Sequence, residues 1–201
     1  MDSFVPVSAP SFAMPLCELE LRGPLPARAA AALRLLMLTG CRLREVLSLR
    51  WDDFDRGSGE LRLRDSKTGA RMVALTPAAL CVLSGIRRHR RSPWVFAARD
   101  PKQHLTALTA YWHFVRQRAG VEDVRIHDLR HSFASRALAL GESLTMIGRL
   151  LGHTDVGSTA RYAHLARDAE RIAVTRVGDS IEADMLRMDA ADAGSAADGA
   201  A

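Results

Sequence analysis

Two histidines, an arginine and a tyrosine in the C-terminal half of the chain have types and spacing that suit chemistry on a phosphodiester. His127 and Arg130 lie three residues apart, and His153 and Tyr162 follow downstream. An imidazole can transfer a proton, a guanidinium binds phosphate oxygens, and a phenol can act as a nucleophile if a neighbour accepts its proton. This stretch contains no acidic cluster suited to a metal ion, so we predict chemistry without a metal or another cofactor.

The helical spacing of His127 and Arg130 places both on one side of a helix, where they could act on the same phosphate. His153 follows Gly152 at a predicted helix end and could donate a further hydrogen bond. Taken singly, these residues fit plainer interpretations, namely a surface histidine, a salt-bridged arginine and a half-buried tyrosine. The combination of residues is what favours catalysis.

Three upstream residues could complete such a site. Arg42 lies at the predicted start of a helix, where peptide N–H groups already favour an anion, and Glu45 is placed to hold its guanidinium. Lys67 is one of only two lysines in a chain rich in arginine. Because an ammonium can give up a proton and a guanidinium cannot, Lys67 is a candidate proton donor, although a solvated turn residue is the alternative.

The elements that must position these residues are mostly helical. Leu61 and Leu63 alternate with arginines, and an apolar stretch over 72–75 follows Lys67, which predicts a β-hairpin with the lysine at its tip. Apolar periodicity together with proline, serine and glycine signals predicts helices over 26–38, 43–49, 77–86, 106–118, 127–140, 143–151, 158–165 and 167–188. The predicted fold class is therefore mainly α-helical with a small antiparallel β-sheet.

Two details of this prediction concern side chains that face the core or the solvent. In the helix from His127 and in the next one, we expect these residues to be buried: Leu129, Phe133, Ala137, Leu140, Met146, Ile147, Leu150 and Leu151.

The basic run 87–91 is predicted to form the last turn of the preceding helix, where it would complement the helix dipole, or else to contact a DNA backbone.

Composition narrows the classes of partner. A chain of 201 residues, 48% of them hydrophobic, fits one domain with a proper core. The net charge is +5 and almost all basic side chains are arginines, which favours nucleic acid as the partner. Biased codon usage is an alternative reason for the excess of arginine. No apolar run is long enough for a membrane span, and three cysteines lack paired spacing, so we expect a cytoplasmic protein.

Five short motifs in order resemble those of the tyrosine recombinases, also called phage integrases. The resemblance covers about Leu25 to Asp179. The motifs are Thr39-Gly40-x-Arg42-x-x-Glu45, Ser66-Lys67-Thr68-Gly69, His127-x-x-Arg130, Leu151-Gly152-His153 and Ala160-Arg161-Tyr162-Ala163-His164-Leu165. Each motif alone is weak, whereas the ordered set is specific. The resemblance implies DNA recombination or DNA integration with double-stranded DNA as substrate, and no small-molecule substrate.

The resemblance also implies a role for each site residue. Tyr162 would attack a DNA phosphate to form a 3′-phosphotyrosyl link, and Arg42 and Arg130 would hold the non-bridging oxygens. Lys67 would protonate the leaving 5′ oxygen. His127 would assist proton transfer, His153 would hydrogen-bond the phosphate, and Glu45 would support the site.

Domain boundaries follow from the same resemblance. Residues 1–24 are predicted to be a loosely ordered leader in place of the core-binding domain that family members carry, residues 25–178 the catalytic domain, and residues 179–201 the end of a helix and a disordered tail. We therefore expect a truncated recombinase or a catalytic-domain fragment. The resemblance implies that the C-terminal helix docks on a neighbouring protomer.

Two other functions remain open from the sequence. The chain could be a DNA-binding or regulatory remnant without recombination activity. It could also be a nicking and closing enzyme similar to the type IB topoisomerases.

Overall fold

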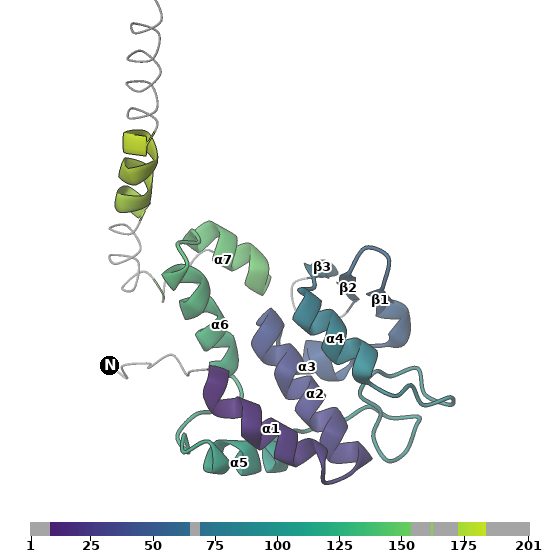
Figure 1. The fold of residues 1–201 in the computed structure, drawn as a ribbon. Helices are drawn as coiled ribbons and strands as arrows, with labels where there is room; N and C mark the ends of the chain where they lie inside the picture. Colours follow the sequence, from purple (N-terminus) through teal and green to yellow (C-terminus); the bar gives the residue numbers. More distant parts are fainter. Residues whose placement is uncertain (1–8, 65–68, 154–161, 163–172, 184–201) are drawn as a thin grey trace, which may run out of the picture.

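The central element of the fold is the helix α2, Pro24–Thr39, in the computed structural model, which describes residues 9–64, 69–153, 162 and 173–183. Gly40 after its last residue ends it as the sequence predicted, whereas its start at Pro24 comes before the predicted start at Pro26. Most of its alanines and leucines are buried, because other helices pack against several of its sides (Figure 1). The predicted mainly α-helical class with a small antiparallel sheet is confirmed.

The helices around α2 form where local signals predicted them, with small shifts of their ends. They are α3 (Leu43–Leu47), α4 (Pro77–Gly85), α5 (Thr109–Arg118), α6 (Asp128–Ala139) and α7 (Leu144–Leu151). Thr76 caps α4 and Ser143 caps α7 through hydrogen bonds to backbone N–H groups. A short 3₁₀ helix, Trp51–Asp53, follows α3.

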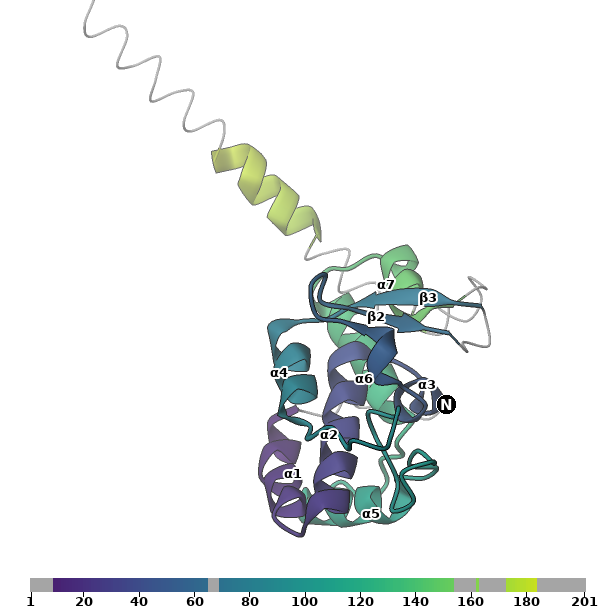
Figure 2. The ribbon, with the colours of Figure 1, turned by 90° about the vertical axis from the view of Figure 1, so that its right-hand side faces the viewer.

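The sheet has three antiparallel strands in the order β1-β2-β3, namely Phe54–Asp55, Glu60–Leu63 and Arg71–Ala74. The sequence predicted β2 and β3 and missed β1, which is only two residues long. Leu61 pairs with Val73 and Leu63 with Arg71. Figure 2 shows β2 and β3 side by side. Because side chains alternate across a strand, this register places Arg71 on the buried face with Leu61, Leu63 and Val73.

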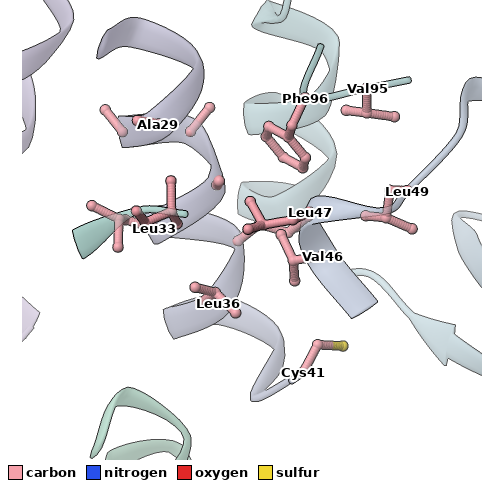
Figure 3. Close-up of a cluster of buried hydrophobic side chains, with 14 of the residues drawn as sticks. Ala29, Leu33, Leu36, Cys41, Val46, Leu47, Leu49, Val95 and Phe96 are labelled. Carbon is pink, nitrogen blue, oxygen red and sulfur yellow. The ribbon is translucent and has the colours of Figure 1, made fainter. Parts of the chain in front are cut away.

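Most of the core is one hydrophobic cluster that surrounds α2. Figure 3 shows Leu33 and Leu36 of α2 beside Val46 and Leu47 of α3, with Phe96 from the segment before α5. A second, smaller cluster joins α6 and α7 to the tyrosine and consists of Ala134, Ala137, Leu138, Ile147, Leu151 and Tyr162. Leu129, one turn earlier on α6, belongs to the main cluster. The division between the two clusters therefore crosses α6.

The N-terminal segment corrects the prediction of a loosely ordered leader over residues 1–24. Residues Ala9–Phe12 form a 3₁₀ helix and Ala13–Glu20 form α1, which packs on α2 and α5. Phe12, Leu16 and Leu19 are buried, and the Phe12 ring lies 5.3 Å from that of Trp112. The prolines of this stretch favoured the prediction of a loose segment, although its apolar residues have the spacing of a helix face. Residues 1–8 lie outside the described residues.

Two further predictions were wrong in detail. The helix α4 ends at Gly85 and Ile86 is extended, so the exposed basic run 87–91 is not the last turn of a helix. Leu140 is 67% exposed, and Met146 and Leu150 are also exposed. Leu140 follows the end of α6, and α7 buries only the narrow stripe that contains Ile147 and Leu151.

Among the described residues, no helix is both long and apolar enough to cross a bilayer. The predicted helix 158–165 lies outside the described residues, apart from Tyr162. The predicted helix 167–188 is described over residues 173–183, which are helical.

Because α1 completes the core, shortening Leu16 should destabilise the whole domain. We expect Leu16→Ala to lower the free energy of unfolding by about 2–5 kcal/mol through the cavity that it leaves. Met14 on the same helix is 71% exposed, so Met14→Ala should change stability by less than about 0.5 kcal/mol. Urea denaturation of both variants measures this difference, and equal stabilities would mean that α1 is not part of the core.

Candidate active site

The candidate site lies where the C-terminal ends of α2 and α7 approach the starts of α3 and α6. Gly40 and Gly152 end α2 and α7 in left-handed conformations, with φ of 62° and 67°. These turns direct backbone carbonyls toward a common centre. Helix C-termini carry partial negative charge, which favours cations at this place. Guanidinium groups of three arginines meet there, from α6, β3 and the start of α3.

Arg130 is the buried member of this group, with 5% of its surface exposed. One terminal nitrogen donates to the carbonyl of Gly40 at 2.6 Å and the other donates to that of Leu151 at 2.7 Å. Burial, reinforced by the charges of Arg42 and Arg71, lowers the pKa of Arg130 to about 10. The guanidinium remains a cation at neutral pH and joins two helix ends.

Glu45 lies between the other two arginines. Its carboxylate accepts hydrogen bonds from the backbone N–H and the guanidinium of Arg42, both at 2.8 Å, and from Arg71 at 3.1 Å. Burial would raise the pKa of this carboxyl, but the Arg42 hydrogen bonds and the charge of Arg71 outweigh it and hold the pKa below its usual range. The predicted support of Arg42 by Glu45 is therefore present as an ion pair.

Arg71 extends this ion pair to α7. It donates to the carbonyl of Leu150 at 3.1 Å, and its Nε, Cδ and Cζ atoms lie against Gly152. A Cβ at position 152 would come within 2.5 Å of the Arg71 Nε. Since residue 152 also has a positive φ, glycine is required there both by the backbone and by this packing. Arg42 reaches the same turn, with a hydrogen bond to the Gly152 carbonyl at 3.3 Å.

Tyr162 enters the site from the small hydrophobic cluster. Its ring packs with Leu151 and Ala134, only 4% of the residue is exposed, and its hydroxyl lies 2.6 Å from Nδ1 of His131. His127, the residue before α6, contacts the His131 ring edge-on at 4.9 Å between centroids. The structure thus places the phenol beside a histidine that adjoins Arg130.

The start of α6 is fixed by a local ion pair. Asp128 accepts hydrogen bonds from the backbone and the guanidinium of Arg125, at 2.8 Å for the backbone N–H. Burial would raise the pKa of this carboxyl, but the Arg125 hydrogen bonds dominate and lower it. Asp128 therefore remains ionised at the dipole-positive end of the helix that carries His127, Arg130 and His131.

The structure brings together most of the residues that the sequence singled out. Arg42, Glu45, Arg130 and Tyr162 line the site as described. His153 directly follows Gly152, and its backbone N–H donates to the Gly148 carbonyl at 2.9 Å. Lys67 lies outside the described residues, so its role remains a prediction.

Sequence reasoning missed two residues of this site, Arg71 and His131. Arg71 comes two residues before the buried Val73 on β3, so both face the same side of the strand. This period of two was the signal in the sequence that could have identified Arg71. His131 lies one turn after His127 and next to Arg130, but the resemblance assigned proton transfer to His127 alone. The contact with Tyr162 depends on the folded chain and could not be read from local spacing.

A separate basic groove lies at the other end of α2. It has a volume of about 1440 Å³ and is lined by Arg28 and Arg34 of α2, by α4 and by the basic run 87–91. The residues that line it include none of the arginines around Glu45. We therefore assign the candidate chemistry to the site at the ends of α2 and α7.

Comparison with known proteins explains this arrangement. The model of the phage integrase family matches residues 14–168. The chain belongs to that family. It is 31% identical over 161 residues to the tyrosine recombinase XerD of Yersinia pestis, in an alignment that covers 74% of this chain and 53% of that protein. The chain thus spans about half the length of the curated relatives it matches.

Solved structures of family members share the fold. The crystal structure of the XerA recombinase superposes with a TM-score of 0.65 at 25% identity, over 86% of this chain and 65% of that one. The catalytic domain of bacteriophage HP1 integrase gives a TM-score of 0.61 at 20% identity, over 86% of this chain and 95% of that domain. The match to the HP1 domain shows that the fold is that of a recombinase catalytic domain.

The ionised Glu45 predicts a pH-dependent contribution to stability. Because the folded-state pKa of Glu45 is lowered, its stabilisation is full above the unfolded-state value near 4.3 and is lost as the pH falls through the folded-state value. We expect Glu45→Gln to lower the free energy of unfolding by about 2 kcal/mol at pH 7 and by much less in acid.

Glu122 provides the matched control, because it is an exposed carboxylate. Glu122→Gln should leave stability unchanged at both pH values. Guanidinium denaturation from neutral pH down to about pH 3.5 measures both variants, a range that crosses the ordinary carboxyl pKa. A Glu45→Gln effect that is the same in acid as at neutral pH would contradict the assigned ionisation.

Proposed function

We propose that this chain is the catalytic part of a site-specific tyrosine recombinase, which cleaves and rejoins DNA strands through Tyr162. The observation that carries the proposal is that a tyrosine and two arginines from distant segments meet at the ends of α2 and α7. Tyr162 packs on Leu151, whose carbonyl accepts from Arg130, and Arg42 donates to the adjacent Gly152 carbonyl. A phosphodiester would bring negative charge to a place that already concentrates positive charge.

The proposed reaction assigns a task to each residue of the motif set. Arg42 and Arg130 bind the non-bridging oxygens of the scissile phosphate and stabilise the charge that develops there. Tyr162 forms the bond to phosphorus as the 5′ oxygen leaves, and Lys67 gives that oxygen a proton. His127 assists proton transfer, His153 hydrogen-bonds the phosphate, and Glu45 keeps Arg42 in place.

Strand transfer of this kind conserves the energy of the cleaved bond in the phosphotyrosyl link. A 5′ hydroxyl of the same or another strand can then attack the link and restore the phosphodiester, so the proposed cycle uses neither a nucleotide nor a metal ion. Double-stranded DNA is the proposed partner. Because the reaction requires access to DNA, a cytoplasmic location is part of the same proposal.

A covalent trap tests this function directly. Nicked suicide duplexes with randomised arms lose the 5′ hydroxyl fragment after cleavage, so the wild-type protein should accumulate a DNA adduct that resists denaturation. Tyr162→Phe should form none, because the nucleophilic oxygen is absent. Denaturing gels and sequencing of the linked DNA measure the outcome.

Tyr111 on α5 is the other tyrosine of the chain and supplies the control. Tyr111→Phe should form the adduct at the wild-type rate. If the wild-type protein formed no adduct with any member of the pool but still bound duplex DNA, the DNA-binding remnant would be the better function. An adduct formed equally by Tyr162→Phe would exclude this nucleophile.

We also propose that the helix 173–183 docks on a neighbouring protomer when the protein is bound to DNA. Val174, Val177 and Ile181 are 73%, 59% and 55% exposed, and their spacing places them on one side of the helix. An apolar stripe that remains exposed is suited to a partner surface. This contact would link recombinase subunits on the two halves of a DNA site.

Charges on this stripe should separate association from DNA binding. We expect the double substitution Val177→Asp and Ile181→Asp to abolish complexes with two or more protomers per duplex, because docking would bury both carboxylates. Binding of a single protomer should stay unchanged. Light scattering of protein mixed with duplex measures the stoichiometry, and Asp179→Ala on the opposite side is the control. Undiminished association of the double variant would exclude this surface.

A further inference from the structure

The histidine that contacts the tyrosine hydroxyl is His131, and the motif assignment gives this residue no role. Nδ1 of His131 lies 2.6 Å from the Tyr162 oxygen, and the ring centroids lie 5.9 Å apart. This distance is short even for a hydrogen bond between oxygen and nitrogen. His127, to which the resemblance assigns proton transfer, contacts the His131 ring.

The geometry defines how a proton could move between the two side chains. In a neutral imidazole one ring nitrogen is protonated and the other accepts. With the proton on Nε2, Nδ1 accepts the hydrogen bond of the phenol and is already in line to take its proton. With the proton on Nδ1, the phenol oxygen would be the acceptor and would lose nucleophilicity. Only the first arrangement serves an attack by Tyr162.

Several charged or titratable groups lie near His131, and its own charge helps to lower the pKa of Asp128. Asp128 lies three residues earlier on α6 and is ionised, so its carboxylate faces the same side of the helix. Arg125 pairs with this carboxylate, Arg130 is the adjacent residue, and His127 is the neighbouring ring.

Burial strengthens the coupling between the two side chains. Tyr162 is 4% exposed and packs among Ala134, Leu138 and Ile147, while His131 is half-buried on the neighbouring turn of α6. Little water therefore competes for the phenol. A proton that leaves Tyr162 needs a partner within this pocket, and His131 is the contact that the structure provides.

We propose that His131 is a catalytic residue, the proton acceptor for Tyr162 during strand cleavage. This role rests on the proposed function. The O–H bond of Tyr162 breaks as its oxygen bonds to phosphorus, and the proton passes to Nδ1 of His131. The bond from phosphorus to the 5′ oxygen breaks, and that oxygen takes its proton from Lys67. Rejoining reverses both transfers, so His131 returns the proton to the phenol.

Substitution by asparagine separates proton transfer from positioning. The amide oxygen of His131→Asn can accept the phenol hydrogen bond near the original Nδ1 position but cannot take up the proton. We expect single-turnover adduct formation on the nicked duplex pool to fall by about 10²–10⁴-fold with DNA affinity unchanged. A His131→Asn variant that cleaves at the wild-type rate would reduce the residue to a positioning role and overturn the proposal.

His131→Ala provides a second measurement, because it leaves space for a base added from solution. Imidazole should restore a measurable part of its lost rate and should have no effect on His131→Asn. His113→Ala on the exposed side of α5 is the control and should cleave like the wild type. If His131→Ala cleaved faster than the wild type, the contact would instead hold Tyr162 inactive, and the proposal would be wrong.

A duplex with sulfur in place of the 5′ bridging oxygen locates the defect along the reaction. A thiolate leaves without a proton, so Lys67→Ala should recover on this substrate while His131→Asn should stay slow. Recovery of His131→Asn would move its role to the leaving group and overturn the proposal. A wild-type protein without any adduct overturns the proposed function and this role together, whereas a wild-type adduct with normal His131→Asn cleavage overturns this role alone.

Discussion

The guanidinium of Arg130 joins two helix ends that the rest of the site is built upon. Its hydrogen bonds to the carbonyls of Gly40 and Leu151 fix the ends of α2 and α7 relative to α6. Arg42 comes shortly after the end of α2, and His153 comes shortly after the end of α7. The positions of both residues therefore depend on these helix ends. A buried cation without such acceptors would be costly, so the two helix ends and the arginine stabilise one another.

A second set of ionic contacts, centred on Glu45, holds the same site on the side that faces the sheet. Glu45 accepts from Arg42 and Arg71, and Arg71 packs beneath Gly152. The carboxylate therefore compensates part of the repulsion among three arginines that would otherwise be close together without a counter-ion. In the proposed function, a bound phosphate would add the negative charge that the carboxylate supplies only in part.

Local signals in the sequence were sufficient for the helices and for the motif residues. Pro24, Gly40, Ser143 and Gly152 mark helix ends through backbone chemistry that acts within a few residues, and Glu45 pairs with Arg42 across one turn. Contacts between distant segments were harder to predict. Arg71 reaches Glu45 and Leu150 only after the hairpin folds over α3 and α7.

The same limit explains the errors at the edges of the fold. The docking of α1 on α5 depends on Trp112, which lies far from Phe12 in the sequence. The run 87–91 looked helical because arginines are good helix formers, but Ile86 is extended and the chain turns there. Propensity describes what a segment tolerates, and the surrounding packing decides which conformation it adopts.

The division of the core across α6 has a consequence for how the site could open. Arg42, Glu45 and Arg71 lie on α3 and β3 or beside them, and these elements belong to the main cluster. Tyr162 belongs to the small cluster of α6 and α7. Small cooperative units open at a lower free-energy cost than the whole domain does, so native-state hydrogen exchange should separate the two. Opening of the small unit alone would withdraw Tyr162 and leave Arg42, Glu45 and Arg71 in place, which in the proposed function is a state that holds DNA without cutting it.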